Sequence, residues 1–284
     1  MRPLVVVCLL VCSLAAACTA ERSQDSAVGS SDAQRGAALA ACAAEPKADL
    51  EACRTVVRLG VVESGARLPE TEAFYTGMAQ AFLAEGQTVG AVAMYRIAVR
   101  LYPFNADLHY KLGDVLVDRL GASEEALGPF MLAVKHRPRF PEAMLALARV
   151  QHELGYFDEA IEQYRALLEI DSSSAEAFAG VGQGLAAKGD HRGAIEVLGR
   201  AALLPSAGDE IWTALARSQS ALGQPDAAAA SLRRAVAINP ESREAFCLRA
   251  QVLTTVGKAE EARAACIQAR RPTEHRASEC ACTP

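Results

Sequence analysis

The sequence predicts an all-α protein built as a solenoid of about six helix–turn–helix repeats behind a helical N-terminal cap. Glycine recurs every 34 or 35 residues, at Gly86, Gly121, Gly155, Gly189, Gly223 and Gly257. An alanine follows each glycine by five residues, at Ala91, Ala126, Ala160, Ala194, Ala228 and Ala262. Such a fixed period marks stacked supersecondary units. The composition, 51% hydrophobic but only 5% aromatic, favours helices over sheets.

Residues 1–17 are predicted to be a signal peptide. Met1, Arg2 and Pro3 supply a short positive start, residues 4–14 form a compact apolar stretch, and residues 15–17 are three alanines. About 11 apolar residues are too few to cross a bilayer as a helix, which takes about 20. We therefore expect the chain to be exported.

The sequence Ala-Ala-Ala-Cys that ends at Cys18 resembles a bacterial lipobox, although Ala15 stands where such motifs usually have leucine. The resemblance implies that Cys18 becomes the mature N-terminus and carries a lipid. Residues 18–32 would then be the anchor and a flexible, Ser-rich tether. This reading gives a lipid-anchored protein of the bacterial envelope that faces the periplasm from the outer membrane. Two alternatives stay open: an uncut anchor, and a plain secretory signal that leaves a secreted or soluble periplasmic protein.

Residues 33–71 are expected to form a helical cap of two helices broken at Pro46. The first apolar face of a solenoid needs cover from an atypical unit, and this segment fits the period poorly. Cys42 and Cys53 flank the Pro46 turn, and in an oxidising compartment we expect them to form a disulfide.

The six repeats follow the cap, and each is expected to have a first helix, a glycine turn and a second helix. Their ranges, called repeats 1 to 6, are 72–105, 106–140, 141–174, 175–208, 209–242 and 243–272. Two departures stand out in repeat 2. Leu120 is an extra residue before Gly121 and predicts a longer first helix or a looser turn. Pro129 falls inside the second helix and is expected to bend or shorten it.

These residues resemble the tetratricopeptide repeat family over about 200 of the 284 residues. Small residues stand at repeat position eight and alanine at position twenty in all six repeats. The position-eight residues are Ala79, Gly113, Ala148, Gly182, Ala216 and Ala250. Bulky side chains stand at position four, at Tyr75, His109, Met144, Phe178, Trp212 and Phe246. The resemblance implies a right-handed superhelical solenoid.

The tail, residues 273–284, contains Cys280 and Cys282, and the last repeat contains Cys247 and Cys266. An even number of cysteines in an exported chain predicts disulfides, and we expect the tail to be bonded back to the last repeat. The alternative is a metal site formed by Cys266, His275, Cys280 and Cys282, but exported thiols usually oxidise instead.

No catalytic constellation is visible. The chain has no glycine-rich phosphate loop, no HExxH and no GxSxG, and its five histidines are scattered. We therefore expect no enzyme activity, no cofactor, no metal and no small-molecule substrate. The formal charge of −5, with acidic and basic residues mixed along the chain, provides no basic stripe for nucleic acid. What remains is a binding module.

The resemblance implies that the first helices line a concave surface where a protein or peptide partner binds. The residues carried over to this groove are Gln80, Tyr110, Asp114, Arg149, His152, Gln183, Arg217 and Gln251, with Glu142, Glu176 and Glu210 among those flanking them. The alternative is that these residues form only a solvated face. The expected function is an envelope-tethered scaffold or adaptor, of the kind that aids assembly of a complex such as a pilus secretin. The alternative is a regulator or scaffold for peptidoglycan hydrolases or synthases.

Overall fold

The structure is a computed structural model that describes residues 37–43, 53–56 and 71–270. The regular structure of these ranges is helical throughout, and they contain no strand. The prediction of an all-α protein built from helical hairpins is confirmed. The described residues fall into two compact units, an N-terminal unit that ends at Phe140 and a C-terminal unit that begins at Pro141.

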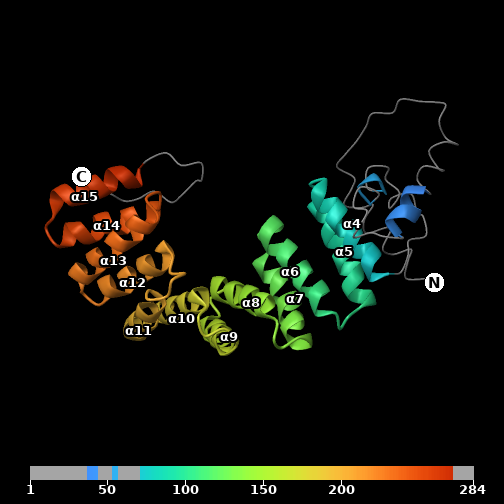
Figure 1. The fold of residues 1–284 in the computed structure, drawn as a ribbon, viewed down its shortest axis with the longest axis horizontal. Helices are drawn as coiled ribbons and strands as arrows, with labels where there is room; N and C mark the ends of the chain where they lie inside the picture. The colour runs from blue at the N-terminus through green and yellow to red at the C-terminus, as the bar shows by residue number, and fades with distance from the viewer. Residues whose placement is uncertain (1–36, 44–52, 57–70, 271–284) are drawn as a thin grey trace, which may run out of the picture. The chain divides into compact units, whose positions relative to one another are not determined.

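In both units the chain runs as successive antiparallel helix pairs (Figure 1). In the N-terminal unit the helices are α4 (Glu72–Ala84), α5 (Thr88–Leu101), α6 (Ala106–Leu120) and α7 (Ser123–His136). In the C-terminal unit they are α8 (Pro141–Glu153), α9 (Phe157–Ile170), α10 (Ala175–Ala187), α11 (His191–Ala201), α12 (Asp209–Ala221), α13 (Pro225–Ile238), α14 (Arg243–Thr255) and α15 (Ala259–Ala269). The first helix of each pair begins at the residue where the glycine period places the start of a repeat.

The six periodic glycines end the first helices, and all of them have positive φ, between 61° and 86°. Glycine is favoured there because a Cβ would strain this left-handed conformation. At Gly86, for example, the amide donates to the carbonyl of Leu83 at 3.0 Å, and the amide of Gln87 donates to Phe82 at 2.8 Å. This pair of hydrogen bonds satisfies carbonyls at the end of α4 and turns the chain into α5.

The two helices of a repeat approach closely because the residues between them are small. Ala148 of α8 and Ala160 of α9 are both fully buried. A Cβ added at Gly182 in α10 would lie 2.7 Å from Cδ2 of Leu198 in α11, which is closer than carbon atoms can pack. Helix–helix contact therefore requires a small residue at repeat position eight.

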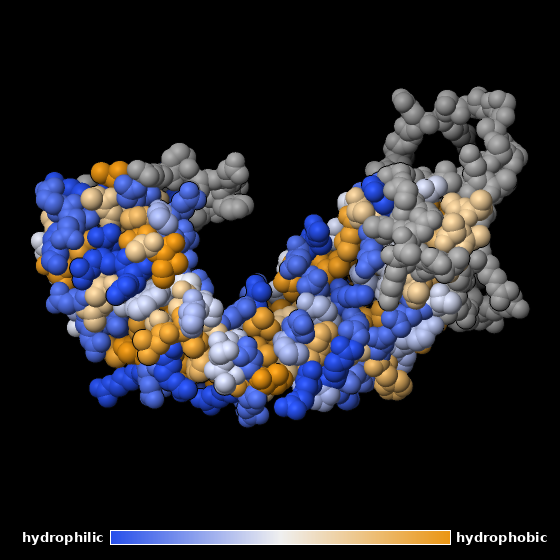
Figure 2. Space-filling model, viewed as in Figure 1, coloured by the Kyte–Doolittle hydropathy of each residue, from blue (hydrophilic) through white to orange (hydrophobic). Residues whose placement is uncertain are grey.

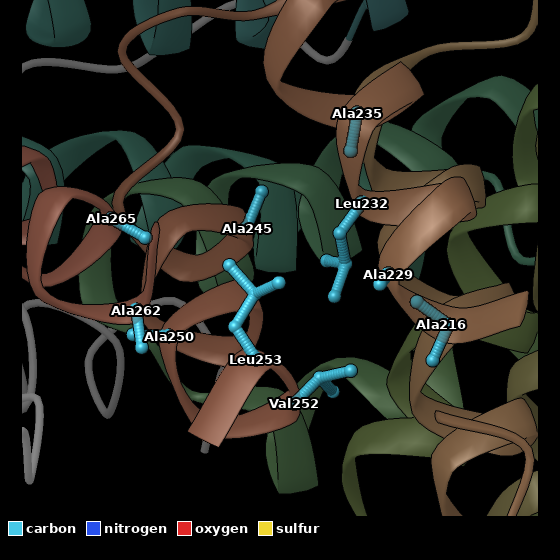
Figure 3. Packing of buried hydrophobic residues seen from close by; sticks show 11 residues of the cluster. Ala216, Ala229, Leu232, Ala235, Ala245, Ala250, Val252, Leu253, Ala262 and Ala265 are labelled. Atoms are coloured by element: carbon cyan, nitrogen blue, oxygen red, sulfur yellow. The ribbon is translucent and has the colours of Figure 1, made fainter. Parts of the chain in front are cut away.

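The last two repeats show how one hairpin covers the next. Leu232 of α13 and Leu253 of α14 lie in the same buried cluster, surrounded by alanines of α12 to α15 (Figure 3). Trp212 and Phe246, the bulky residues at position four, pack against this cluster from its edge. Alanine is thus the close-contact residue, and the larger side chains fill the space beside it.

Repeat 2 forms both of its helices despite the extra residue Leu120 and the proline at position 129. α6 has 15 residues where α4 has 13, so Leu120 extends the first helix as one of the two expected outcomes. Pro129 does not shorten the second helix, because α7 keeps 14 residues with Pro129 inside it, the same length as α5, and the bend that was the other expected outcome stays a prediction. Pro129 lacks an N–H and removes one hydrogen bond, but burial of Phe130 and Ala133 on the same helix holds α7 together.

The predicted disulfide between Cys42 and Cys53 is present, and both residues are fully buried. The Sγ of Cys42 lies 3.6 Å from Sδ of Met78, so the bond packs against α4. Arg54 also forms a 2.8 Å ion pair with Glu85 at the end of α4. These contacts join the cap to repeat 1, while Pro46 and the rest of the expected cap helices lie outside the described residues.

Candidate partner-binding groove

A cavity of about 720 Å³ opens within the C-terminal unit on the side of its first helices. Arg149 comes from α8, Gln183 from α10 and Glu210 from α12, so three successive repeats contribute to it. The remaining lining comes from α9, α10 and the loops, through Tyr164, Asp171, Ser173, Ser174, Ala175, Glu176, Ala179, Gly180 and Ser206.

On the α10 side, small residues form part of the cavity lining. Ala179 and Gly180 follow one another there, and the ring of Tyr164 from α9 lies over the Gly180 backbone. A Cβ at Gly180 would lie 2.5 Å from Cε1 of that ring, so any side chain would push the tyrosine away. Burial raises the pKa of Tyr164 to about 12, and its neutral phenol can donate a hydrogen bond.

The charged side chains of the cavity are not paired with one another. Arg149 and Glu176 both act on Tyr164, the arginine lowering its pKa and the glutamate raising it, yet they form no ion pair in the described structure. Two repeats later the equivalent residues, Arg217 and Glu244, do form an ion pair. The arrangement at Arg149 and Glu176 therefore leaves a cation and an anion open to a ligand.

Of the predicted groove residues, the structure brings Arg149 and Gln183 together in the cavity. The others in the C-terminal unit are elsewhere or engaged. The ring of His152 packs edge-on against Phe157 with ring centroids 5.3 Å apart, Arg217 is paired with Glu244, and Gln251 is exposed. Loop residues and Tyr164 were missed because they lie at positions that the repeat pattern assigns to turns and packing.

In the N-terminal unit the predicted residues have different surroundings. Tyr110 packs against Phe130 and Phe140, with ring centroids 6.0 and 5.2 Å away, and Gln80 is exposed. Asp114 is half-buried, and its pKa is raised above the ordinary value, first by burial and then by the nearby Asp118. The interpretation of Asp114 as part of a freely solvated face is therefore too simple, because burial stabilises its neutral form.

The remaining cysteines fall partly outside the described residues. Cys247 and Cys266 are both in disulfide bonds. Cys18, His275, Cys280 and Cys282 lie outside the described ranges, so the lipid site and most of the alternative metal set belong there. Among residues 37–43, 53–56 and 71–270, no group of three or more His, Cys, Asp or Glu side chains is placed to hold a metal ion. Within the same ranges, no helix has both the length and the apolar character needed to cross a bilayer.

Models of the tetratricopeptide repeat match residues 76–137, 132–175 and 209–252, which together make up just over half of the chain. The chain belongs to the tetratricopeptide repeat (TPR) family. A curated relative, human tetratricopeptide repeat protein 7B, is 27% identical over 118 residues. That match covers 42% of this TPR chain and 14% of the relative, so the chain spans only a small part of that protein.

Solved TPR structures share the fold at low sequence identity. A tetratricopeptide repeat protein from Parabacteroides merdae matches with a TM-score of 0.62 and 16% identity, over 83% of this chain and 92% of that one. YrrB, described as a TPR protein with an unusual peptide-binding site, matches with a TM-score of 0.54 and 20% identity, over 62% of this chain and 91% of that one. At these identities the likeness establishes the fold.

Proposed function

We propose that this chain is a protein-interaction scaffold that binds an extended segment of a partner protein along the first helices of its C-terminal unit. The observation that carries the proposal is the cavity formed by α8, α10 and α12, where Arg149, Gln183 and Glu210 meet. Family membership and the peptide-binding site in the description of YrrB support a peptide as occupant.

The residues that line the cavity are better suited to binding a peptide backbone than to catalysing a reaction. Gln183 offers both donors and acceptors, the phenol of Tyr164 is a neutral donor, and serines stand at the rim. An extended peptide exposes N–H and C=O groups that such side chains satisfy. Ala179 and Gly180 add no large side chain to this part of the lining.

The cellular setting belongs to the same proposal. The signal-like residues 1–17 and the lipobox-like Cys18 support a scaffold tethered to the bacterial envelope and facing the periplasm, with the outer membrane as its site. The buried Cys42–Cys53 disulfide supports export, because such bonds persist in oxidising compartments. A secreted or soluble periplasmic form is the alternative. Mass spectrometry of the mature protein decides between them: an unmodified protein cut elsewhere would overturn the anchor.

Site-specific crosslinking tests the groove. A photoreactive amino acid at position 183 lies in the cavity, whereas one at Glu196, exposed on α11, does not. We expect a partner to be captured from position 183 and not from position 196. Equal capture from both positions, or capture only from position 196, would show that a different surface binds.

The identity of the captured protein separates the roles that remain. Secretin subunits would support the assembly of an envelope complex such as a pilus. Cell-wall hydrolases or synthases would support the alternative role as a scaffold for peptidoglycan enzymes. In either case the chain itself carries out no chemistry in this proposal.

A further inference from the structure

We infer that the cavity in the C-terminal unit accepts a cationic side chain, lysine or arginine, from the partner's extended segment. This inference rests on the proposed function and adds the chemistry of the segment. It follows from the charges of the lining, from how the equivalent charges are used elsewhere in the chain, and from the neutral groups around them.

The lining has an excess of negative charge. Asp171, Glu176 and Glu210 face a single arginine, Arg149. Asp171 already accepts hydrogen bonds from the backbone N–H and the hydroxyl of Ser173, and these bonds hold its pKa below the ordinary value. Glu176 and Glu210 have no hydrogen bond or ion pair within the described residues. Together with Arg149, which is likewise unpaired, they leave two negative charges and one positive charge for a ligand.

The same repeat position is neutralised internally in repeats 2 and 6, whereas Glu142 of repeat 3 has no partner among the described residues and lies outside the cavity. In repeat 2 it holds Asp107, which pairs with Arg137, and in repeat 6 it holds Glu244, which pairs with Arg217. In repeats 4 and 5 it holds Glu176 and Glu210. The residue equivalent to Arg217 is Arg149 for Glu176, which forms no ion pair with it, and the neutral Gln183 for Glu210. A position in the first helical turn suits an acidic residue through the helix dipole in all these repeats. The dipole therefore explains why acids stand there, and of the three acids that have no partner among the described residues, Glu176 and Glu210 line the cavity.

The other lining groups fit the stem of a basic side chain. Tyr164 and Ala179 border the cavity, although each is only 5% exposed, and the stem of a lysine or arginine can pass them while its charged head reaches the glutamates. A volume of about 720 Å³ also leaves room for the flanking backbone. An acidic segment would instead meet unpaired carboxylates, which disfavours it.

The surface around the C-terminal repeats supports recognition by charge rather than by a broad apolar face. Hydrophilic residues cover much of the visible surface of α12 to α15, with smaller hydrophobic groups between them (Figure 2). The large exposed hydrophobic side chains of this unit include Leu203, Ile238 and Ile267, which come from three different repeats.

Synthetic peptides test the inference without knowledge of the natural partner. Three fluorescent peptides of equal length differ only in two central residues, which are lysine, glutamine or glutamate. Their affinities for the full chain are measured by anisotropy at low salt. We expect the lysine peptide to bind about five- to tenfold more tightly than the glutamine peptide, as for two partly exposed ion pairs. The glutamate peptide should bind most weakly.

Two double variants with the same change of charge locate the effect. Glu176→Gln with Glu210→Gln removes the cavity charges and should abolish the preference for lysine over glutamine. Glu162→Gln with Glu196→Gln removes two exposed charges from α9 and α11, away from the cavity, and should keep that preference. If the preference survives in the first variant, or disappears equally in both, the inference is wrong.

A third variant separates this inference from the proposed function. Gln183→Trp fills the cavity without altering its charge and should weaken all three peptides. If the peptides bind equally well and Gln183→Trp weakens them all, the groove stands and the charge preference fails. If no peptide binds, or if Gln183→Trp changes nothing, the proposed function fails and the inference falls with it. Circular dichroism of each variant confirms that the helices are intact.

Discussion

Repeat 2 and repeat 4 present side chains at the same positions of their first helices, but the consequences differ. In repeat 2, Tyr110 packs its ring against Phe130 and Phe140. In repeat 4 the equivalent residue is Ala179, followed by Gly180, and the space beside them is open to a ligand. The comparison shows that a shared backbone repeat fixes where a groove can lie, while the size of one or two side chains decides whether it is open.

The largest expected effect comes from removing the aromatic side chain that fills the repeat 2 face. Tyr110→Ala loses the contacts with Phe130 and Phe140 and should lower the free energy of unfolding by about 2–3 kcal/mol. Chemical denaturation measures the change. Tyr110→Phe keeps the ring and should lose clearly less stability than Tyr110→Ala. An equal loss in both variants would mean that the hydroxyl, rather than ring packing, stabilises this face.

Adding a methyl group on the repeat 4 face gives the next effect. Gly180→Ala places a Cβ against the Tyr164 ring, and the overpacking should destabilise the protein by about 1–2 kcal/mol, even after the better helix propensity of alanine is counted. Gly199→Ala, on α11 of the same repeat, meets open space and should stabilise the fold by about 0.5–1 kcal/mol.

These two glycine variants should therefore change stability in opposite directions, and thermal unfolding reports both. A stabilising Gly180→Ala would show that Tyr164 moves aside at no cost. Glycine at position 180 would then not be needed for the packing of Tyr164.

The turns and the close helix contacts of the repeats could be predicted from the sequence, because both recur with the period of the backbone. The six glycines predicted the turns, and the alanines at position twenty predicted the close helix contacts, since each has one steric reason that repeats. The assignment of Arg149 and Gln183 to a groove used the same regularity.

The shape of the cavity depends on features outside that regularity. Tyr164 occupies a position that normally only packs, and here its ring also borders the opening over Gly180. The repeat pattern places Arg149 and Glu176 at the same positions as Arg217 and Glu244. Only Arg217 and Glu244 form an ion pair among the described residues. Whether such a pair forms depends on side-chain rotamers and on neighbouring residues, and a repeat pattern gives no information on either.

That difference between the two pairs predicts a small contrast in stability. A double-mutant cycle with Arg217→Gln and Glu244→Gln should give a coupling energy of about 0.2–1 kcal/mol, because the pair is exposed, and salt should reduce it. The same cycle with Arg149→Gln and Glu176→Gln should give a coupling near zero in the absence of a ligand. Equal couplings from the two cycles would show that the cavity charges are paired in solution and are not available to a partner.

The finest contrast concerns two buried tyrosines. Burial raises the pKa of both Tyr95 and Tyr164 to about 12, but their neighbouring charges differ. Asp114 raises the pKa of Tyr95 further, whereas at Tyr164 Arg149 lowers the pKa and Glu176 raises it. Because these folded-state values lie above about 10, the ordinary phenol value, the stability that the neutral phenols contribute is complete below pH 10 and is lost as the pH rises towards 12.

Removing each neighbouring charge should therefore shift the two phenols in opposite directions. Asp114→Asn should lower the pKa of Tyr95, and Arg149→Gln should raise that of Tyr164. NMR titration of ring-labelled tyrosine measures both values, and Glu196→Gln, an exposed charge on α11, serves as the control that should leave them unchanged. A shift of both phenols in the same direction would point to a change in overall charge. Opposite shifts require that an acid adjoins the tyrosine in the N-terminal unit and a base adjoins the tyrosine at the cavity.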